Sequence, residues 1–328
     1  MNILLLDVAA SESGALSVLD QYYKELQIDS ENHYYLCVSS SNFKSLGNMT
    51  VLKFPWVKKS WLHRVWFELY YVKKLVNKHN ISRIFSLENL ILADIPCEKW
   101  IYLHTSIPFT DLHFSLLSTP KIWVYKHLIG KLIYRSICKA DKVIVQTHWM
   151  RDACLSKASI EPSRIEVQMP KIDCRDIVQC VDRDKVKHRL FYPATSLKYK
   201  NHLLVLNALI CLKERGTLGE LQFDLTLTGC ENTTAKKLYK IAVKNRLPVN
   251  FLGKLPREQV MEKYASSTLV FPSYMETFGL PLLEARLSDT LVIASDCSFS
   301  REILEGYDGA MFFSPYDAHA LADILEQL

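Results

Sequence analysis

Two glutamates eight residues apart are the side chains in this sequence best suited to chemistry on a hydroxylated ligand. They are Glu276 and Glu284, within the string Phe271-Pro-Ser-Tyr-Met-Glu-Thr-Phe-Gly-Leu-Pro-Leu-Leu-Glu284. A carboxylate can accept two hydrogen bonds from the vicinal hydroxyls of a sugar or a ribose. An isolated pair of this kind is more often a helix-terminal acid and a solvated acid, so the surrounding string has to decide between these interpretations.

The string predicts a phosphate site between the two acids. The apolar run 268–272 predicts a buried strand, and a loop after it opens a helix near Gly279. The first turn of a helix offers free N–H groups and a positive dipole end to an anion. Gly279 lets the backbone approach a ligand closely, and Pro281 fits the first helical turn. Two carboxylates beside such a site suit a ligand made of a sugar, a diphosphate and a ribose.

A second strand, loop and helix are predicted by Phe191-Tyr-Pro-Ala-Thr-Ser-Leu-Lys-Tyr-Lys-Asn-His-Leu-Leu-Val-Leu-Asn-Ala208. Its segment Lys200-Asn201-His202 falls at the start of the helix. A lysine there could neutralise the charge that develops on a leaving diphosphate. The alternative is a solvated basic loop without a ligand.

The string from Phe271 to Glu284 resembles the E-x7-E motif of the family 4 glycosyltransferases, which are retaining enzymes of the GT-B fold. The resemblance covers most of the chain, is strongest over 189–328, and points to members that build bacterial polysaccharide, capsule or the O-antigen of lipopolysaccharide. It implies that Glu276 contacts the transferred sugar and that Glu284 contacts the nucleotide ribose. It also implies that backbone amides between them hold the distal phosphate and the sugar hydroxyls, namely those of Thr277, Phe278, Gly279 and Leu280.

The resemblance extends to the lysine loop, with one departure. Lys200 matches the lysine of the family's G-R-x4-K segment, but the arginine expected five residues earlier is Thr195. One phosphate contact is therefore missing, unless Lys198 supplies it or the diphosphate is bound more weakly.

Other loops of the donor site are also implied by the resemblance. Gly14 and Ala15, in the loop after the first strand, match the glycine loop beside the donor phosphates and the acceptor. Gly229 and Leu255 follow two later strands and match loops near the base and the ribose, with Leu255 offering its backbone to the base. Taken alone, Gly14 would indicate only an ordinary strand-to-helix turn.

Two histidines follow predicted strands. His104 belongs to the string Leu103-His-Thr-Ser-Ile-Pro-Phe109, which resembles bacterial polysaccharide glycosyltransferases whose histidine faces the transferred sugar. A lone histidine is otherwise more often structural. His148 lies where the family often has another polar residue, so a structural or acceptor-side role is expected for it.

The elements that must position these residues alternate along the chain between apolar runs and amphipathic stretches. Such alternation predicts two doubly wound α/β domains with parallel sheets, and ligands bind at the carboxyl ends of such strands. We expect an acceptor-binding domain over 1–172 and a donor-binding domain over 173–328, facing across a cleft, with a polar linker near 170–188. The predicted strands are 2–6, 34–38, 84–87, 100–103, 143–146, 189–193, 222–228, 268–272 and 291–295, and the predicted helices include 201–214, 234–245, 280–287 and 316–327.

Composition narrows the class of protein. The chain has 328 residues, 49% of them apolar and 23% charged, and no uncharged apolar run is long enough to span a membrane. The acid Asp7 and the lack of a basic leader predict a first strand in place of a signal peptide. Nine scattered cysteines without a C-x-x-C pair indicate free thiols and a cytoplasmic protein.

The positive charge lies in the first half, where residues 1–170 carry 20 Lys and Arg against 15 Asp and Glu. Residues 53–83 interleave basic and aromatic side chains, and a second basic cluster follows over 121–142. This pattern is typical of an interfacial helix on anionic lipid, here the inner face of the cytoplasmic membrane. A core helix with a solvated basic face explains it equally well. Nucleic acid is a poorer partner, because no recognition motif accompanies the charge.

No metal or other cofactor is expected. Asp182-Arg-Asp184 has the D-x-D spacing of metal-dependent transferases of another fold class, but it lies in the polar linker and predicts solvated charge. The sequence therefore predicts a metal-independent, retaining hexosyltransferase that uses a nucleotide-diphosphate sugar. Its acceptor would be a glycan or a lipid-linked glycan. The alternatives are a non-catalytic binding subunit of the same fold and a nucleotide-sugar epimerase. Family members usually add a crossover helix after the one expected at 316–327, and we expect the second domain to lack it.

Overall fold

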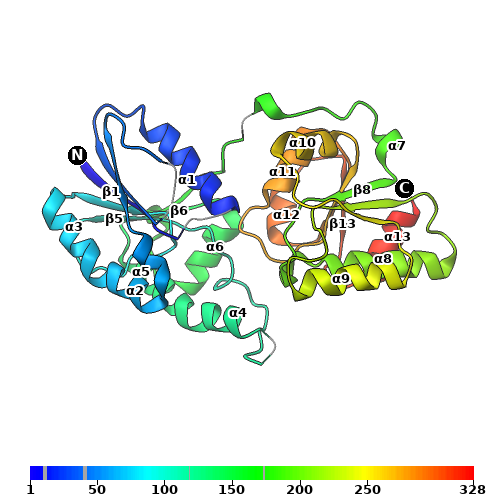
Figure 1. Cartoon of the computed structure of the whole chain (residues 1–328), viewed down its shortest axis with the longest axis horizontal. Helices are drawn as coiled ribbons and strands as arrows, with labels where there is room; N and C mark the ends of the chain where they lie inside the picture. The colour runs from blue at the N-terminus through cyan, green and yellow to red at the C-terminus, as the bar shows by residue number, and fades with distance from the viewer. Residues whose placement is uncertain (10–12, 40–42, 118, 173) are drawn as a thin grey trace. The chain divides into compact units, whose positions relative to one another are not determined.

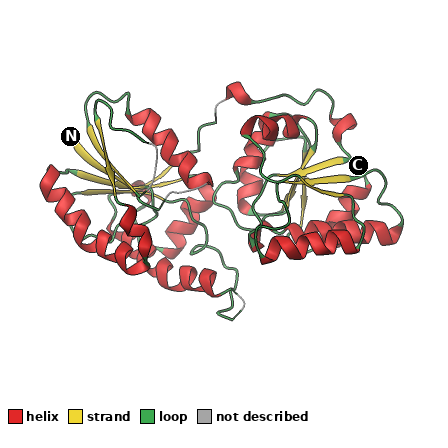
Figure 2. Cartoon of the chain, in the orientation of Figure 1, coloured by secondary structure: helices red, strands yellow, loops and turns green. Residues whose placement is uncertain are grey.

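The computed structural model describes all residues of the chain except 10–12, 40–42, 118 and 173. The chain divides into two compact units, Met1–Pro170 (unit 1) and Lys171–Leu328 (unit 2), each containing a sheet and its helices (Figures 1 and 2). This division lies two residues before the boundary expected from the sequence.

Unit 1 is built on a seven-stranded sheet whose named strands are all parallel. The spatial order is β3-β2-β1-β4-β5-β6-β7. The strands are β1 (Asn2–Asp7), β2 (His33–Val38), β3 (Met49–Lys53), β4 (Arg83–Ser86), β5 (Glu98–Tyr102), β6 (Lys142–Val145) and β7 (Ile165–Val167).

Strand β1 shows why this sheet is covered on both faces. Its side chains alternate between two apolar clusters, because successive residues of a strand point to opposite faces. Ile3 and Leu5 pack in one cluster with Leu19, whereas Leu4 and Leu6 belong to the other. All four strand residues are buried. A strand with buried apolar side chains at successive positions, here 3–6, is typical of a parallel sheet between helices.

Two long helices of unit 1 each contain a π-helical stretch. The first runs through α2 (Trp61–Trp66), η2 (Phe67–Tyr71) and α3 (Val72–His79), and the second through α4 (Pro120–Val124), η3 (Tyr125–Ile129) and α5 (Gly130–Lys139). Stretches of π-helix often occur at functional sites. The described residues of this unit also form α1 (Ser13–Leu26), α6 (His148–Lys157) and the short 3-10 helices η1 (Pro55–Lys59) and η4 (Pro162–Arg164).

Unit 2 has a parallel sheet of six strands in the order β10-β9-β8-β11-β12-β13. In Figure 1, α8, α9 and α13 lie along one face of this sheet, and α10, α11 and α12 lie on the other. The strands are β8 (Arg189–Tyr192), β9 (Gln222–Leu225), β10 (Val249–Phe251), β11 (Thr268–Phe271), β12 (Val292–Ser295) and β13 (Ala310–Phe313). The helices are α7 (Arg183–Val186), α8 (His202–Arg215), α9 (Thr233–Lys244), α10 (Arg257–Ala265), α11 (Leu280–Leu287), α12 (Ser298–Ile303) and α13 (Ala318–Glu326).

The predicted fold class is confirmed, and the elements differ from the sequence expectation in a few places. The sequence missed β3, β7 and β13, which are short strands on the outer parts of the sheets. Strand β9 ends at Leu225, three residues earlier than expected.

The segment expected to be a free polar linker is in part anchored to unit 2. The Cys180 amide donates to the Ser288 carbonyl at 2.7 Å, and Arg183 forms ion pairs with Asp289 and Asp308. Polar side chains of this segment make these surface contacts. The polarity of the segment therefore does not show that it is detached from the domain.

Candidate active site

Two loops of unit 2 meet because the strands before them are neighbours. Strands β8 and β11 pair in parallel, so the loops 193–201 and 272–279 leave the same edge of the sheet. The Tyr274 amide donates to the Tyr199 carbonyl at 3.2 Å. The Asn201 side chain, at a left-handed position before α8, donates to the Pro272 carbonyl at 3.2 Å. These bonds hold the two predicted ligand loops against each other.

The contact of Lys200 with Glu276 is the centre of this site. The Lys200 Nζ lies 2.5 Å from Glu276 Oε1, and the side chains are only 18% and 15% exposed. The hydroxyl of Ser273, which is fully buried, donates to the same oxygen at 2.6 Å. The structure thus brings together two residues 76 positions apart that the sequence selected separately, and a charge-assisted hydrogen bond joins them.

The start of α11 has the geometry expected from the string. Gly279 is the residue before the helix and has φ 94°, a left-handed conformation that favours glycine. A Cβ there would lie 3.1 Å from Leu282 Cδ1. Thr277 and Leu280 are half-buried, whereas Phe278 is buried in the core, so Phe278 could contact a ligand with its backbone and not with its side chain.

Glu284 is buried and bonded, in contrast to the solvated acid that an isolated pair would suggest. It is only 6% exposed and lies one and a half turns into α11 on a face covered by α10. Arg257 and Tyr264 of α10 both donate to its carboxylate. The structure therefore places the two predicted acids in separate hydrogen-bond networks.

The predicted base and ribose loops follow β9 and β10. Gly229 has φ 83°, and its amide donates to Glu231 Oε2 at 3.1 Å. Burial would raise the pKa of Glu231, but the amides of this loop outweigh it and lower that pKa. Leu255 is half-buried between β10 and α10. Both loops leave the sheet at the same edge as the Lys200 and Glu276 loops, because all six strands are parallel.

The departure at Thr195 remains in the folded unit. Thr195 and Lys198 are both exposed, and Lys198 begins a short 3-10 turn that ends at Lys200. His202, the first residue of α8, is buried, and burial together with the Lys200 charge lowers its pKa to about 3. His202 is therefore a neutral packing residue beneath the loop.

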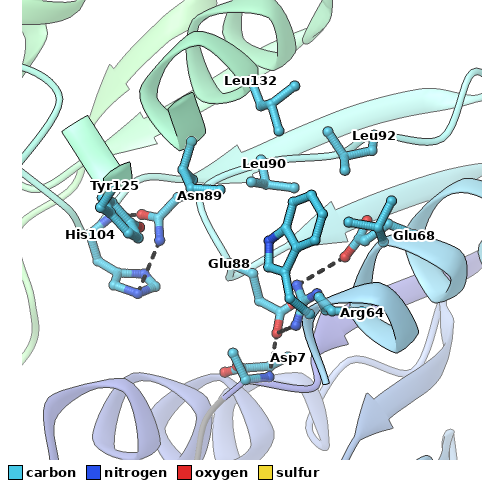
Figure 3. A pocket seen from close by; sticks show the side chains of 14 residues that line it. Asp7, Arg64, Glu68, Glu88, Asn89, Leu90, Leu92, His104, Tyr125 and Leu132 are labelled. Atoms are coloured by element: carbon cyan, nitrogen blue, oxygen red, sulfur yellow. Dashed lines mark hydrogen bonds and ion pairs between the residues drawn. The ribbon is translucent and has the colours of Figure 1, made fainter. Parts of the chain in front are cut away.

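In unit 1, His104 follows β5 and lines a pocket of about 420 Å³ (Figure 3). The His104 amide donates to Asn89 Oδ1 at 2.7 Å, and its Nε2 lies 3.3 Å from Asn89 Nδ2. Burial lowers the pKa of His104, although Glu88 acts in the opposite direction, so the imidazole is neutral. The remaining walls are largely apolar and include Trp61, Val65, Leu90, Leu92, Ile129 and Leu132.

A buried ionic cluster forms one end of this pocket. Figure 3 shows the Arg64 guanidinium between Glu68 and Glu88. The Glu68 and Glu88 side chains are 1% and 2% exposed. Burial raises the pKa of Glu68 to about 7, and Glu88 adds to this rise while Arg64 opposes it. Glu88 also accepts from the Ala9 amide, which fixes the start of the loop after β1.

The remaining predicted residues of unit 1 lie near helix starts. Gly14 and Ala15 belong to the first turn of α1, so the sequence was wrong in assigning them to the loop. Residues 10–12 of that loop lie outside the described residues. His148 is exposed and is the first residue of α6.

No group of three or more His, Cys, Asp or Glu side chains that could hold a metal ion occurs among the residues that the structure describes. The D-x-D segment has structural roles, since Asp182 caps α7 and its lysine and arginine neighbours form surface ion pairs. A metal-independent reaction stays a prediction. None of the described helices has both the length and the apolar character to cross a bilayer.

Several residues of these sites were missed from the sequence. Ser273 lies three positions before Glu276 in the same loop, and its place in the motif string could have suggested it. Arg257, Tyr264 and Arg64 carry no local signal, because their partners are brought to them only by tertiary packing.

The two Rossmann-like units match a solved structure of WaaG, a glycosyltransferase involved in lipopolysaccharide biosynthesis. The TM-score is 0.72 at 14% identity, and the match covers all of this chain and 90% of that one. The fold is therefore GT-B. Residues 178–328, which make up most of unit 2, match the family model described as glycosyl transferases group 1.

Two relatives of this chain are named for an enzymatic activity. The O-antigen chain mannosyltransferase RfbU of Salmonella typhimurium is 24% identical over 202 residues, which are 60% of this chain and 54% of the relative. The O-antigen chain mannosyltransferase B of Escherichia coli is 35% identical over 82 residues, 24% of this chain and 21% of that relative. The matches thus span about half, or less, of the relatives' length.

Proposed function

We propose that this protein is a retaining glycosyltransferase that moves a hexose from a nucleotide-diphosphate sugar to a growing surface polysaccharide of the O-antigen type. The observation that carries the proposal is the contact of Lys200 with Glu276 beside the start of α11, in the unit that matches the group 1 family model. Mannose is the hexose to test first, because both curated relatives are named mannosyltransferases.

The donor would be held by unit 2. Its diphosphate would lie at the start of α11, where the helix dipole and free amides favour an anion. Lys200 would leave Glu276 and bind the diphosphate, because a doubly charged ligand competes well with one carboxylate. Glu276 would then be free to accept from the hydroxyls of the sugar. Glu284 would bind the ribose.

The transfer step needs no protein nucleophile. The acceptor hydroxyl attacks the anomeric carbon from the face that the diphosphate leaves, the bond from that carbon to the phosphate oxygen breaks, and the departing phosphate takes the hydroxyl proton. The new bond thus replaces the old one on the same face, and the configuration is retained. Lys200 and the α11 amides stabilise the charge that develops on the leaving group.

The acceptor site is proposed for unit 1. The pocket beside His104 combines apolar walls with carboxylate, amide and imidazole groups, which suits a hydroxylated ligand with an apolar face. A glycan or a lipid-linked glycan meets this description. The pocket lies between the two helices that contain π-helical stretches.

Unit 1 would work on the inner face of the cytoplasmic membrane. Exposed apolar side chains gather on α2 and η2, where Trp61, Leu62, Trp66 and Tyr70 are each at least half exposed. The exposed lysines Lys73 and Lys74 follow in α3. Aromatic side chains and lysines together favour an anionic lipid surface. Flotation with vesicles tests this, with binding expected for phosphatidylglycerol vesicles and much less for phosphatidylcholine vesicles.

A donor screen tests the proposed reaction. Wild type, Glu276→Ala and the control Glu214→Ala, an exposed acid of α8, are each mixed with UDP-, GDP- and dTDP-hexoses with and without EDTA. We expect one nucleotide class to raise the melting temperature of all three proteins, and nucleotide release to be lost only in Glu276→Ala. Release that disappears with EDTA would contradict the metal-independent reaction.

Two other outcomes of the screen favour the alternatives. Binding of a nucleotide sugar without any turnover would favour a non-catalytic binding subunit, which the exposed Thr195 in place of an arginine would suit. Conversion of the sugar while it stays on the nucleotide would favour an epimerase. No stabilisation by any nucleotide would overturn the donor site itself.

A further inference from the structure

The carboxylate of Glu284 is held on both of its oxygens by one helix. Arg257 Nη1 lies 2.8 Å from Glu284 Oε1, and the Tyr264 hydroxyl lies 3.0 Å from Oε2. The two donors are seven residues apart on α10 and so lie on the same face, two turns from each other. The position and rotation of the carboxylate are therefore set by α10, although Glu284 itself belongs to α11.

Both donors have further contacts of their own. Tyr264 is only 1% exposed, and its ring packs edge to face on Phe191 of β8 with the centroids 5.7 Å apart. Arg257 has a second acid beside it, since its Nε lies 3.6 Å from Asp176 Oδ2. A carboxylate bonded on both oxygens, one of them by a buried tyrosine, is held in its orientation without a ligand, which lowers the entropic cost of binding.

Two acceptor positions of Glu284 stay available in this arrangement. An ionised carboxylate has about four lone-pair sites on its two oxygens, and the two donors of α10 occupy one site on each oxygen. One unused site remains on each oxygen. A vicinal diol matches this pattern, because it has two neighbouring hydroxyl donors. A ligand with a single hydroxyl would leave one of these buried sites unpaired, and that is costly.

We propose that Arg257 and Tyr264 are positioning residues that present Glu284 to a ribose diol and make the site select ribonucleotides over 2′-deoxyribonucleotides. The inference rests on the proposed function, in which Glu284 binds the nucleotide ribose. It adds that the selectivity is built by α10, through two side chains that do not touch the nucleotide.

The test is calorimetric titration of the full chain with the matched pairs UDP and 2′-deoxy-UDP, and GDP and 2′-deoxy-GDP. For the nucleotide that binds, we expect wild type to prefer the ribose form by about 10-fold, the effect of one hydrogen bond to a charged group. Arg257→Ala and Tyr264→Phe should bring this ratio below about 3-fold, mainly by weakening the ribose form. Arg257→Lys should restore part of the ratio, because it keeps the charge without the planar fork.

Lys237→Ala, which removes an exposed cation of α9, is the matched control and should keep the wild-type ratio. The ratio within one variant is the readout, so a general loss of stability or affinity cannot imitate the effect. If wild type binds the ribonucleotide and the 2′-deoxyribonucleotide of a pair equally, the inference is wrong while the proposed donor site stands. The same holds if the variants keep the wild-type ratio. If wild type binds none of the four nucleotides, the inference is wrong, and if it also binds no dTDP-hexose, the proposed function fails as well.

Discussion

Unit 1 and unit 2 hold buried charge in opposite ways. In unit 2 each predicted acid has its own cation, Lys200 for Glu276 and Arg257 for Glu284. In unit 1 a single cation, Arg64, serves two almost completely buried acids within an apolar pocket. We expect the first arrangement to accept an anion in place of the carboxylate, and the second to exclude one.

The difference suggests how the two units divide the ligands. A nucleotide diphosphate needs a cation that can be released, and a glycan needs hydrogen-bond acceptors beside an apolar wall. The group 1 family model matches unit 2 and begins at residue 178, after unit 1 has ended. This is the pattern expected if the proteins that match this family model share a donor site and differ in their acceptor surfaces.

The largest effect is expected on the rate of sugar transfer when Lys200 is removed. Lys200→Met should lower sugar transfer by about 100-fold to 1000-fold, because the leaving diphosphate loses its cation. Nucleotide-diphosphate affinity should fall by about 10-fold in the same variant. The measurement is nucleotide release at saturating donor, together with titration of the nucleotide. Lys237→Met is the control, and equal losses in both variants would contradict a specific role of Lys200.

The next effect is on the stability of unit 1. Arg64→Met leaves Glu68 and Glu88 buried without their cation, which should cost about 3–5 kcal/mol of unfolding free energy. Urea denaturation at neutral pH measures it. Arg135→Met, at an exposed position of α5, should change stability by less than about 0.5 kcal/mol. If Arg64→Met were as stable as wild type, the cluster would not differ from the surface ion pairs of unit 2.

The third effect is a pH dependence confined to unit 1. The pKa of Glu68 is raised from 4.5 to about 7 in the folded protein. Folding therefore favours the protonated acid, so its contribution to stability is complete below about pH 4.5 and is lost as the pH rises through 7. Glu68→Gln removes this titration and should raise unfolding free energy at pH 8 relative to wild type by about 2 kcal/mol, and little at pH 4.5. An equal effect of the variant at both pH values would show that Glu68 does not titrate in this range.

Much of the proposed donor site could be selected from the sequence, because its residues lie in two short strings that follow buried strands. Neighbouring parallel strands bring such loops to one edge, so Lys200 and Glu276 could be selected without knowing that they touch. Gly279 was predictable for a similar reason, since strand, loop and helix follow one another within a few residues.

The rest depended on contacts between distant elements. Arg257 reaches Glu284 across 27 residues, and Arg64 reaches Glu88 across 24. No spacing rule connects residues in helices that pack only after folding. The sequence also missed β3, β7 and β13, because their short segments carry too little apolar periodicity to separate them from loops. The basic and aromatic pattern over 53–83 also failed to show that Phe54 and Phe67 are core residues while Trp61 and Tyr70 are exposed.

The smallest expected effect compares two glycines of unit 2. Gly279 and Gly216 both have positive φ, 94° and 78°, so alanine at either should cost about 1 kcal/mol of stability. Only Gly279 lies at the proposed phosphate site, whereas Gly216 ends α8 and has nothing within 4 Å of an added Cβ. Gly279→Ala should therefore weaken nucleotide-diphosphate binding by about 5-fold to 10-fold, and Gly216→Ala should not change it. Thermal melts and titrations of both variants measure the two quantities separately. Equal affinity in the two variants would remove the start of α11 from the donor site, and with it the contrast between a unit built to bind an anion and a unit built to exclude one.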